Sequence, residues 1–123
     1  MGLKEYFFDT YAAIELIKSN PSFEKYINER IRITFLNLLE ITYITFLNFG
    51  AKDAEKVYIR FKEFVVDVSD EVVIKAIEFR AQNKRKSLSY ADCLGYVFAK
   101  ENNLIFLTGD DAFNGLLNVE FVK

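Results

Sequence analysis

The chain has 123 residues, of which 51% are hydrophobic and 28% are charged, with a formal net charge of −2. This length and hydrophobicity predict one folded domain, residues 1–123, and the near-neutral charge gives no overall attraction to nucleic acid. The absence of His excludes serine-hydrolase triads, histidine acid–base chemistry and most zinc sites. The single Cys, Cys93, excludes an internal disulfide and indicates a reducing compartment.

Short apolar segments alternate with helical patterns along the chain. In chain order, strands are expected at 4–8, 31–35, 64–68, 104–108 and 119–122. Helices are expected at 10–19, after Asn20-Pro21, from the cap Asn37 to Phe49, at 51–62, after the cap Ser69 and at 90–102 after the cap Ser89, with a helical turn after residue 108. The alternation predicts an α/β fold, with a central parallel sheet of four to five strands flanked by helices on both faces.

The sequence does not have the pattern of an export signal or of a membrane span. The first residues, MGLKEYFFD, lack the long apolar core of a signal peptide. Residues 33–51 approach the length of a span, but polar residues interrupt them: Thr34, Asn37, Glu40, Thr42, Thr45 and Asn48. We therefore expect a soluble, cytoplasmic protein with no membrane segment.

Isolated acidic residues are the most informative feature of the sequence. Each stands in a stretch of nine or more residues that otherwise carries no charge: Asp9, Glu40, Asp92, and Asp110 with its neighbour Asp111. A buried carboxylate without a partner is costly, and the carboxyl ends of parallel strands meet at one edge of a sheet. We therefore expect these acids to gather there and to hold a hard divalent cation, Mg²⁺ or Mn²⁺.

Helix capping is the structural alternative for each acid. Ser89 with Asp92, and Thr108 with Asp111, have the spacing of a capping box, and Asn37 with Glu40 has a looser version. Asp9 ends a strand and could cap the helix that follows. The box at Thr108 uses Asp111 and leaves Asp110 without a capping role. Four such acids at one end of a sheet favour a shared ion.

The motifs FFDTYAAIE, NLLEITYITF and SLSYADCLGYVFAKENNLIFLTGDDAF together resemble those of the PIN domain, and most closely the VapC-type toxins of toxin–antitoxin pairs. Asp9-Thr10 matches the Asp of the first strand, Glu40 the Glu of the following helix, and Asp92 the helix-opening Asp. Thr108, Asp110 and Phe113 match the closing motif. The aromatic region 41–63, and Cys93 with Gly95, depart from the usual pattern without touching the acids.

This resemblance implies a metal-dependent endoribonuclease. Asp9, Asp92 and Asp110 would hold the main metal, and Glu40 would orient the attacking water or help to hold a second ion. Thr108 would hydrogen-bond a carboxylate, and Asp111 would be a cap or an auxiliary acid. Lys84, Arg85 and Lys86, just before the Asp92 helix, are the candidate RNA contacts. A second basic set, Lys52, Lys56 and Arg60, is better explained as a solvated helix face.

The resemblance also implies partners. A homodimer is expected to bury aromatic residues from 41–61, because that region is more apolar than one sheet face requires. A small antitoxin would cover the acidic site with hydrophobic and basic side chains. A PIN-fold nuclease with a housekeeping role in RNA processing remains the alternative within the family.

Two other classes have acids at strand ends. An aspartyl-phosphate hydrolase would need Asp-x-Asp after the first strand, where this chain has Asp9-Thr10-Tyr11. A phosphoreceiver-like signalling domain could use Asp67 as its phosphoacceptor, but it would give Glu40 and Asp92 no role.

Overall fold

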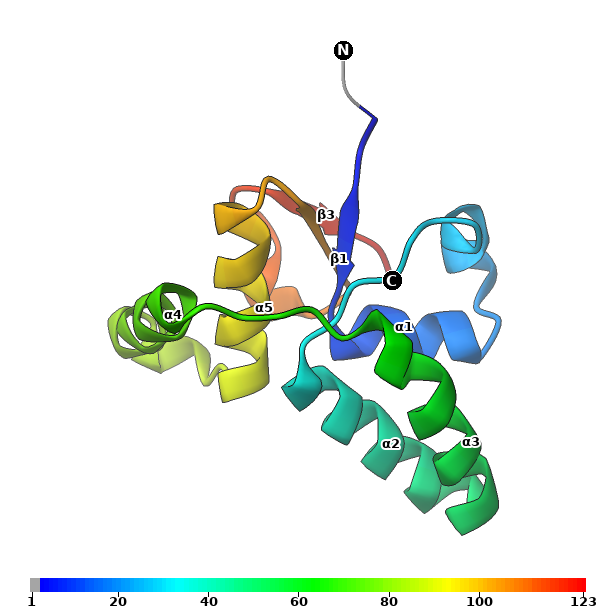
Figure 1. The fold of residues 1–123 in the computed structure, drawn as a ribbon. Coiled ribbons are helices and arrows are strands. Elements are labelled where there is room, and N and C mark those ends of the chain that lie inside the picture. Colours follow the sequence, from blue (N-terminus) through cyan, green and yellow to red (C-terminus); the bar gives the residue numbers. More distant parts are fainter. Residues whose placement is uncertain (1–2) are drawn as a thin grey trace.

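A computed structural model describes residues 3–123 and contains a three-stranded parallel sheet. The strands are β1 (Tyr6–Phe8), β2 (Ile105–Thr108) and β3 (Val119–Phe121), in the order β1-β2-β3. Phe7 pairs with Phe106, and Leu107 pairs with Glu120. The middle strand therefore comes from the C-terminal part of the chain, with helices on both faces of the sheet (Figure 1).

Two extended segments continue the sheet beyond β1 without becoming strands. The Phe8 amide donates to the Arg32 carbonyl at 2.9 Å, and Ile33 forms a single parallel bridge with Val65. The expected strands at 31–35 and 64–68 are therefore wrong, as is a count of four to five. Thr34 leaves the sheet to cap a helix, and Phe64 still belongs to a 3₁₀ turn, Lys62–Phe64, so only one residue of each segment pairs.

Five α-helices and four 3₁₀ turns complete the described part of the chain, residues 3–123. The α-helices are α1 (Thr10–Ile17), α2 (Phe35–Phe49), α3 (Ala51–Phe61), α4 (Asp70–Gln82) and α5 (Tyr90–Glu101). The 3₁₀ turns are η1 (Pro21–Tyr26), η2 (Lys62–Phe64), η3 (Lys84–Lys86) and η4 (Asp111–Phe113). Ser69 and Ser89 cap α4 and α5 as expected.

The start of α2 differs from the prediction. Thr34 is the cap, its hydroxyl accepts from the Asn37 amide at 3.3 Å, and the Asn37 side chain accepts from the Thr34 amide at 2.9 Å. Asn37 is therefore the third helical residue of a capping box rather than the cap, because Thr34 supplies the hydroxyl one turn earlier. Gly50 ends α2 with a φ of 92°, which a residue with a side chain rarely adopts, and α3 follows at once.

The core has two halves, one on each face of the sheet. Phe7 and Phe106 are fully buried on the face covered by α4 and α5, while Phe8 and Leu107 are fully buried on the face covered by α1, α2 and α3. This alternation along β1 and β2 is what a strand covered on both sides requires. Gly95 lets α5 approach closely, since a Cβ there would lie 2.7 Å from Cε1 of Phe7.

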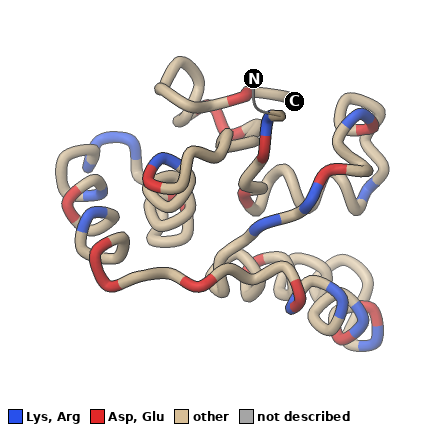
Figure 2. Tube along the Cα trace, turned by 45° about the horizontal axis from the view of Figure 1, so that its top comes forward, with Lys and Arg blue, Asp and Glu red and all other residues tan. Residues whose placement is uncertain are grey.

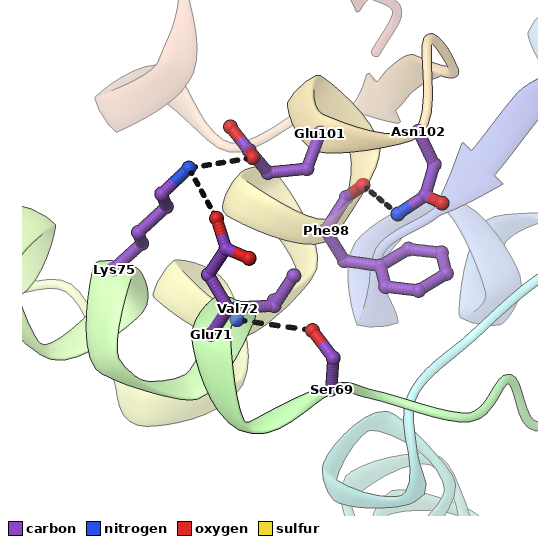
Figure 3. Close-up of polar contacts among 7 residues, drawn as sticks. All are labelled: Ser69, Glu71, Val72, Lys75, Phe98, Glu101 and Asn102. Atoms are coloured by element: carbon purple, nitrogen blue, oxygen red, sulfur yellow. Dashed lines mark hydrogen bonds and ion pairs between the residues drawn. The ribbon is translucent and has the colours of Figure 1, made fainter.

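Polar contacts fasten α4 to α5 at the protein surface (Figure 3). Lys75 on α4 reaches Glu101 on α5 at 2.7 Å and Glu71 on its own helix at 3.1 Å. Beside them, the Asn102 side chain donates to the Phe98 carbonyl at 2.9 Å and so closes the end of α5. The Lys75–Glu101 pair thus links the two helices that flank the basic segment, of which α5 carries Asp92.

Within residues 3–123, none of the helices has the length and apolar character needed to cross a bilayer. Charged residues of both signs are distributed over the helices and loops (Figure 2).

Candidate metal-dependent nuclease site

Asp9 lies at the carboxyl end of β1 and is 4% exposed. Its Oδ1 accepts from the Ala12 amide at 2.8 Å, which caps α1, and its Oδ2 accepts from the hydroxyl of Thr108 at the end of β2. The expected capping role and the expected contact between Thr108 and a carboxylate are both present. Asp9 is thus fixed by donors from two elements that begin or end at this edge of the sheet.

Asp92 lies in the first turn of α5 and forms the expected capping box. Its Oδ2 accepts from the Ser89 amide at 2.9 Å, and its own amide donates to the Ser89 hydroxyl at 3.0 Å. The capping box fixes the side chain at the start of the helix that packs behind β1. Capping and a place in the acidic cluster are therefore compatible for this residue.

Asp110 follows β2 and caps the 3₁₀ turn η4, because its Oδ1 accepts from the Ala112 amide at 3.0 Å. Its amide donates to the Thr108 hydroxyl at 3.0 Å, so Thr108 contacts both Asp9 and Asp110. The expected capping box of Thr108 with Asp111 is wrong, because the cap is Asp110 and the turn begins only at Asp111, two residues later than a helix capped by Thr108 would begin. Asp111 is exposed and pairs with Lys123 at 3.2 Å.

Glu40 lies on the second turn of α2 and is half-buried. Its Oε1 accepts from the Thr10 hydroxyl at 2.5 Å, and the Thr10 oxygen accepts from the Asn37 side chain at 3.1 Å. The looser capping box of Asn37 with Glu40 is therefore not formed. The chain Asn37–Thr10–Glu40 was not anticipated, although Asn37 and Glu40 share one helix face at a spacing of three residues and Thr10 adjoins Asp9.

The pKa shifts of Asp9, Glu40 and Asp92 include contributions from neighbouring acids. Burial raises the pKa of Asp9 to about 7, and the charges of Asp92 and Asp110 add to the effect of burial. Burial likewise raises the pKa of Asp92, with a contribution from Asp110, and that of Glu40, with a contribution from Asp92. Asp111 contributes to none of these shifts. These contributions, and the hydrogen bonds that link Thr108 to Asp9 and Asp110 and Thr10 to Glu40, place the expected set Asp9, Glu40, Asp92 and Asp110 at the same end of the sheet (Figure 1 shows the strand ends and helix starts that carry it).

The chemistry of this donor set suits a hard divalent cation. None of the ion pairs formed by residues 3–123 involves these four acids, so they have no cationic side chain as a partner. Hydrogen bonds in the described chain engage only one oxygen each of Glu40, Asp92 and Asp110. In the described residues no three of these side chains stand close enough to share an ion as placed. The donors therefore fit Mg²⁺ in kind and charge, and would have to close around it.

The basic segment adjoins the acids. Lys84, Arg85 and Lys86 form the exposed turn η3 between α4 and α5, and the Lys86 amine donates to the Ala112 carbonyl at 3.0 Å. Since Ala112 is also the residue whose amide Asp110 caps, this contact brings the end of η3 to the turn beside Asp110. The other basic set lies on α3, where Lys56 and Arg60 border a cavity of about 420 Å³ with apolar residues such as Leu16 and Ile31.

Comparison with known proteins identifies this arrangement. The model of the PIN domain family matches residues 6–116, which is most of the chain and includes all four acids. The chain belongs to the PIN domain family. Among curated proteins, none matches the sequence. The family assignment confirms the resemblance and the α/β fold with a parallel sheet and flanking helices.

Solved structures share this PIN fold over nearly their whole length. A toxin–antitoxin complex from Klebsiella pneumoniae matches with a TM-score of 0.75 at 16% identity, over 94% of this chain and 96% of the other. VapBC2 from Rickettsia felis, bound to a promoter DNA fragment, matches with a TM-score of 0.72 at 20% identity, over 96% and 98%. VapC20 from Mycobacterium tuberculosis, a toxin that cleaves the sarcin–ricin loop, matches with 0.73 at 15% identity, over 94% and 99%.

Proposed function

We propose that this PIN domain is a Mg²⁺-dependent endoribonuclease that hydrolyses RNA phosphodiester bonds, with Mn²⁺ as an alternative ion. The observation that carries the proposal is the gathering of Asp9, Glu40, Asp92 and Asp110, with raised pKa values for three of them and no cationic partner in the described chain. Negative charge without a compensating side chain needs a cation before a phosphate can approach.

Each acid has a role that follows from its fixed position. Asp9, Asp92 and Asp110 would hold the ion, because they converge from β1, α5 and the end of β2. When bound, Mg²⁺ supplies Lewis-acid activation of the scissile phosphate and of a water molecule. Glu40, held by Thr10, would orient the attacking water from the α2 side or help to hold a second ion. Thr108 positions Asp9 and Asp110 relative to each other, and Asp111 is left outside as an exposed, paired acid.

The basic turn η3 is the proposed contact for the RNA backbone. Lys84, Arg85 and Lys86 are exposed and adjoin the acids through the contact of Lys86 with Ala112. Cationic side chains at the edge of an acidic site supply the phosphate attraction that a net charge of −2 does not.

We further propose that the protein is the toxin of a type II toxin–antitoxin pair in the cytoplasm. The fold shared with a Klebsiella toxin–antitoxin complex and with Rickettsia VapBC2 supports this role. A small antitoxin would neutralise the acids and exclude RNA from the site. A homodimer is supported by exposed apolar side chains on α2 and α3: Tyr43, Phe46, Leu47, Phe49 and Ile59.

Housekeeping RNA processing by the same site is the alternative. The adjacent gene separates the two roles, because a toxin requires a neighbouring antitoxin whose product silences the nuclease. A phosphoreceiver role has no support, since Asp67 is exposed and contributes to none of the pKa shifts of the clustered acids.

RNA cleavage by the purified protein tests the central proposal. Structured and single-stranded RNA should be cut in the presence of Mg²⁺ and not in EDTA, and Asp92→Asn should abolish cutting while keeping the capping acceptor of α5. Asp111→Asn is the matched control, because it changes a neighbouring acid that lies outside the cluster. Full activity of Asp92→Asn would refute the proposed site.

A further inference from the structure

A cation–π pair, Arg80 with Tyr90, joins the last turn of α4 to the first turn of α5. The Arg80 guanidinium carbon lies 4.2 Å from the centre of the Tyr90 ring, and the Arg80 Nε donates to the Leu88 carbonyl at 3.0 Å. The hydrogen bond and the ring together fix the orientation of the guanidinium group. Long surface side chains otherwise lack a fixed orientation. Tyr90 itself is 58% exposed, so the pair forms part of the protein surface rather than of the core.

A cavity of about 300 Å³ opens beside this pair. Its lining includes two cationic residues, an amide and an aromatic ring, and no acid: Arg80, Lys84, Asn83 and Tyr90. This volume is at the lower end of the range for small-molecule sites, the size of one ring system rather than of a large ligand. Its chemistry suits a flat, polar ring with a phosphate attached.

Two elements, α5 and η3, connect the cavity to the acidic cluster. Tyr90 and Asp92 are both in the first turn of α5, where helical geometry places Cα atoms two residues apart at a distance of about 5 Å. On the other side, the turn η3 begins at Lys84, which lines the cavity, and ends at Lys86, which contacts the carbonyl of Ala112 beside Asp110. A strand of RNA lying along η3 would therefore connect the cavity to the acids.

We propose that this cavity binds one unstacked base of the RNA substrate, stacked on the Arg80 guanidinium that Tyr90 supports, with Lys84 on the adjoining phosphate. The inference rests on the proposed nuclease function and adds a base-binding position next to the site of cleavage. Guanidinium planes and aromatic rings are the surfaces on which single-stranded RNA bases stack, and the stack is open to several bases because each has a π face.

RNA binding without cleavage tests the base site. In an Asp92→Asn parent, the affinity for a fluorescein-labelled single-stranded RNA octamer of mixed sequence is measured by anisotropy over a range of salt concentrations. Tyr90→Ala should weaken binding about tenfold with an unchanged salt dependence, because it removes the support of a base stack. Tyr90→Phe should bind like the parent. Lys84→Ala should weaken binding and also lower the salt slope by about one, as the loss of a phosphate contact does.

Leu117→Ala is the control, since it removes a large exposed side chain, 77% exposed, from the segment before β3 and outside the proposed dimer surface. Thermal unfolding of each variant separates binding from packing. If the pair is only a strut between α4 and α5, Tyr90→Ala will melt earlier and still bind the octamer like the parent, which would overturn the base site and leave the nuclease proposal intact. A parent that binds no RNA would overturn both proposals.

Discussion

The Thr108 hydroxyl donates a hydrogen bond to the Asp9 carboxylate across 99 residues of sequence, and it joins the ends of β1 and β2 at the acidic cluster. The same oxygen accepts from the Asp110 amide at 3.0 Å. One buried hydroxyl therefore sets the relative positions of two acids on different segments. Because Asp9 is almost fully buried, its charged form is costly, and the hydrogen bond from Thr108 stabilises that form and so lowers the pKa of Asp9.

Thr108→Val should lower the free energy of unfolding by about 2 kcal/mol, because it removes a donor from a buried carboxyl group. The pKa of Asp9 should rise further, since the Thr108 hydrogen bond lowers it. Urea unfolding and an NMR titration of the Asp9 carboxyl group measure the two effects. Thr108→Ser is the control that keeps the hydroxyl; equal stability of the Val and Ser variants would contradict the role assigned to Thr108.

Asp9 should make the metal-free protein less stable as the pH rises. Its pKa is raised from 3.8 to about 7 in the folded state, so the folded protein keeps a proton that the unfolded chain releases. The contribution of the Asp9 proton to the free energy of unfolding is therefore fully present below about pH 4 and is lost as the pH rises through about 7. Between pH 5 and pH 8 the loss from Asp9 should be about 3 kcal/mol, and Asp92 and Glu40, whose pKa values are also raised, act in the same direction.

Urea unfolding in EDTA near pH 5 and near pH 8 measures this slope. Asp9→Asn should flatten it, while Asp111→Asn should leave it unchanged. Added Mg²⁺ should restore stability at pH 8 in the wild type and not in Asp9→Asn, and calorimetric titration of both proteins should show binding only to the wild type. Equal Mg²⁺ binding by the two would remove Asp9 from the proposed metal site.

Thr10→Ala should lower RNA cleavage about tenfold by releasing Glu40 from its fixed position, which is a part of the roughly hundredfold or more that a positioned acid–base group contributes. The pKa of Glu40 should rise, since its hydrogen bond from Thr10 lowers it, and the acidic limb of the pH–rate profile should move to higher pH. Thr42→Ala is the control, because Thr42 lies on α2 like Glu40 and its hydroxyl donates to the Leu38 carbonyl, at 2.7 Å, rather than to an acid. An unchanged pH profile would contradict a positioning role for Thr10.

Phe46→Asp should convert the proposed homodimer to a monomer, because it places a charge among the exposed apolar side chains of α2 and α3. Light scattering at micromolar concentration measures the mass. Leu117→Asp, at a position 77% exposed in the segment before β3, should leave the dimer intact. A wild-type protein that is monomeric at this concentration would refute the dimer.

The sequence contains the signals for most of the fold because its local patterns are strong. The all-apolar runs at β1 and β2, the Ser caps of α4 and α5, and Gly50 after α2 each act within a few residues. The absence of the two strands expected at 31–35 and 64–68 could not be anticipated from such local patterns. Thr34 fits a strand and a cap equally well, and the choice depends on Asn37 reaching back to complete the capping box.

In the candidate site, too, the sequence indicates what depends on local patterns and not what depends on tertiary packing. Isolated acids in apolar runs indicate Asp9, Glu40, Asp92 and Asp110, because burial without a partner is costly wherever the fold places them. The contact of Glu40 with Thr10 joins residues 30 apart, and the pair of Arg80 with Tyr90 depends on how α4 packs on α5. Such contacts are set by tertiary packing, which one sequence does not specify locally. Likewise, the cap after β2 is Asp110 rather than Thr108 with Asp111, because the chain forms a 3₁₀ turn that begins at Asp111.

Asp9, Asp92 and Asp110 each hold the first turn of a helix as well as a corner of the acidic cluster. A mutation that removes the acid and its oxygen together, such as a change to Ala, would fray that turn and cost about 1 kcal/mol at each position. Asn and Ser keep an acceptor at the helix start and give up only the charge. Lineages in which the proposed nuclease has lost its activity should therefore accumulate Asn or Ser at these three positions before Ala, and a survey of inactive descendants would show whether they do.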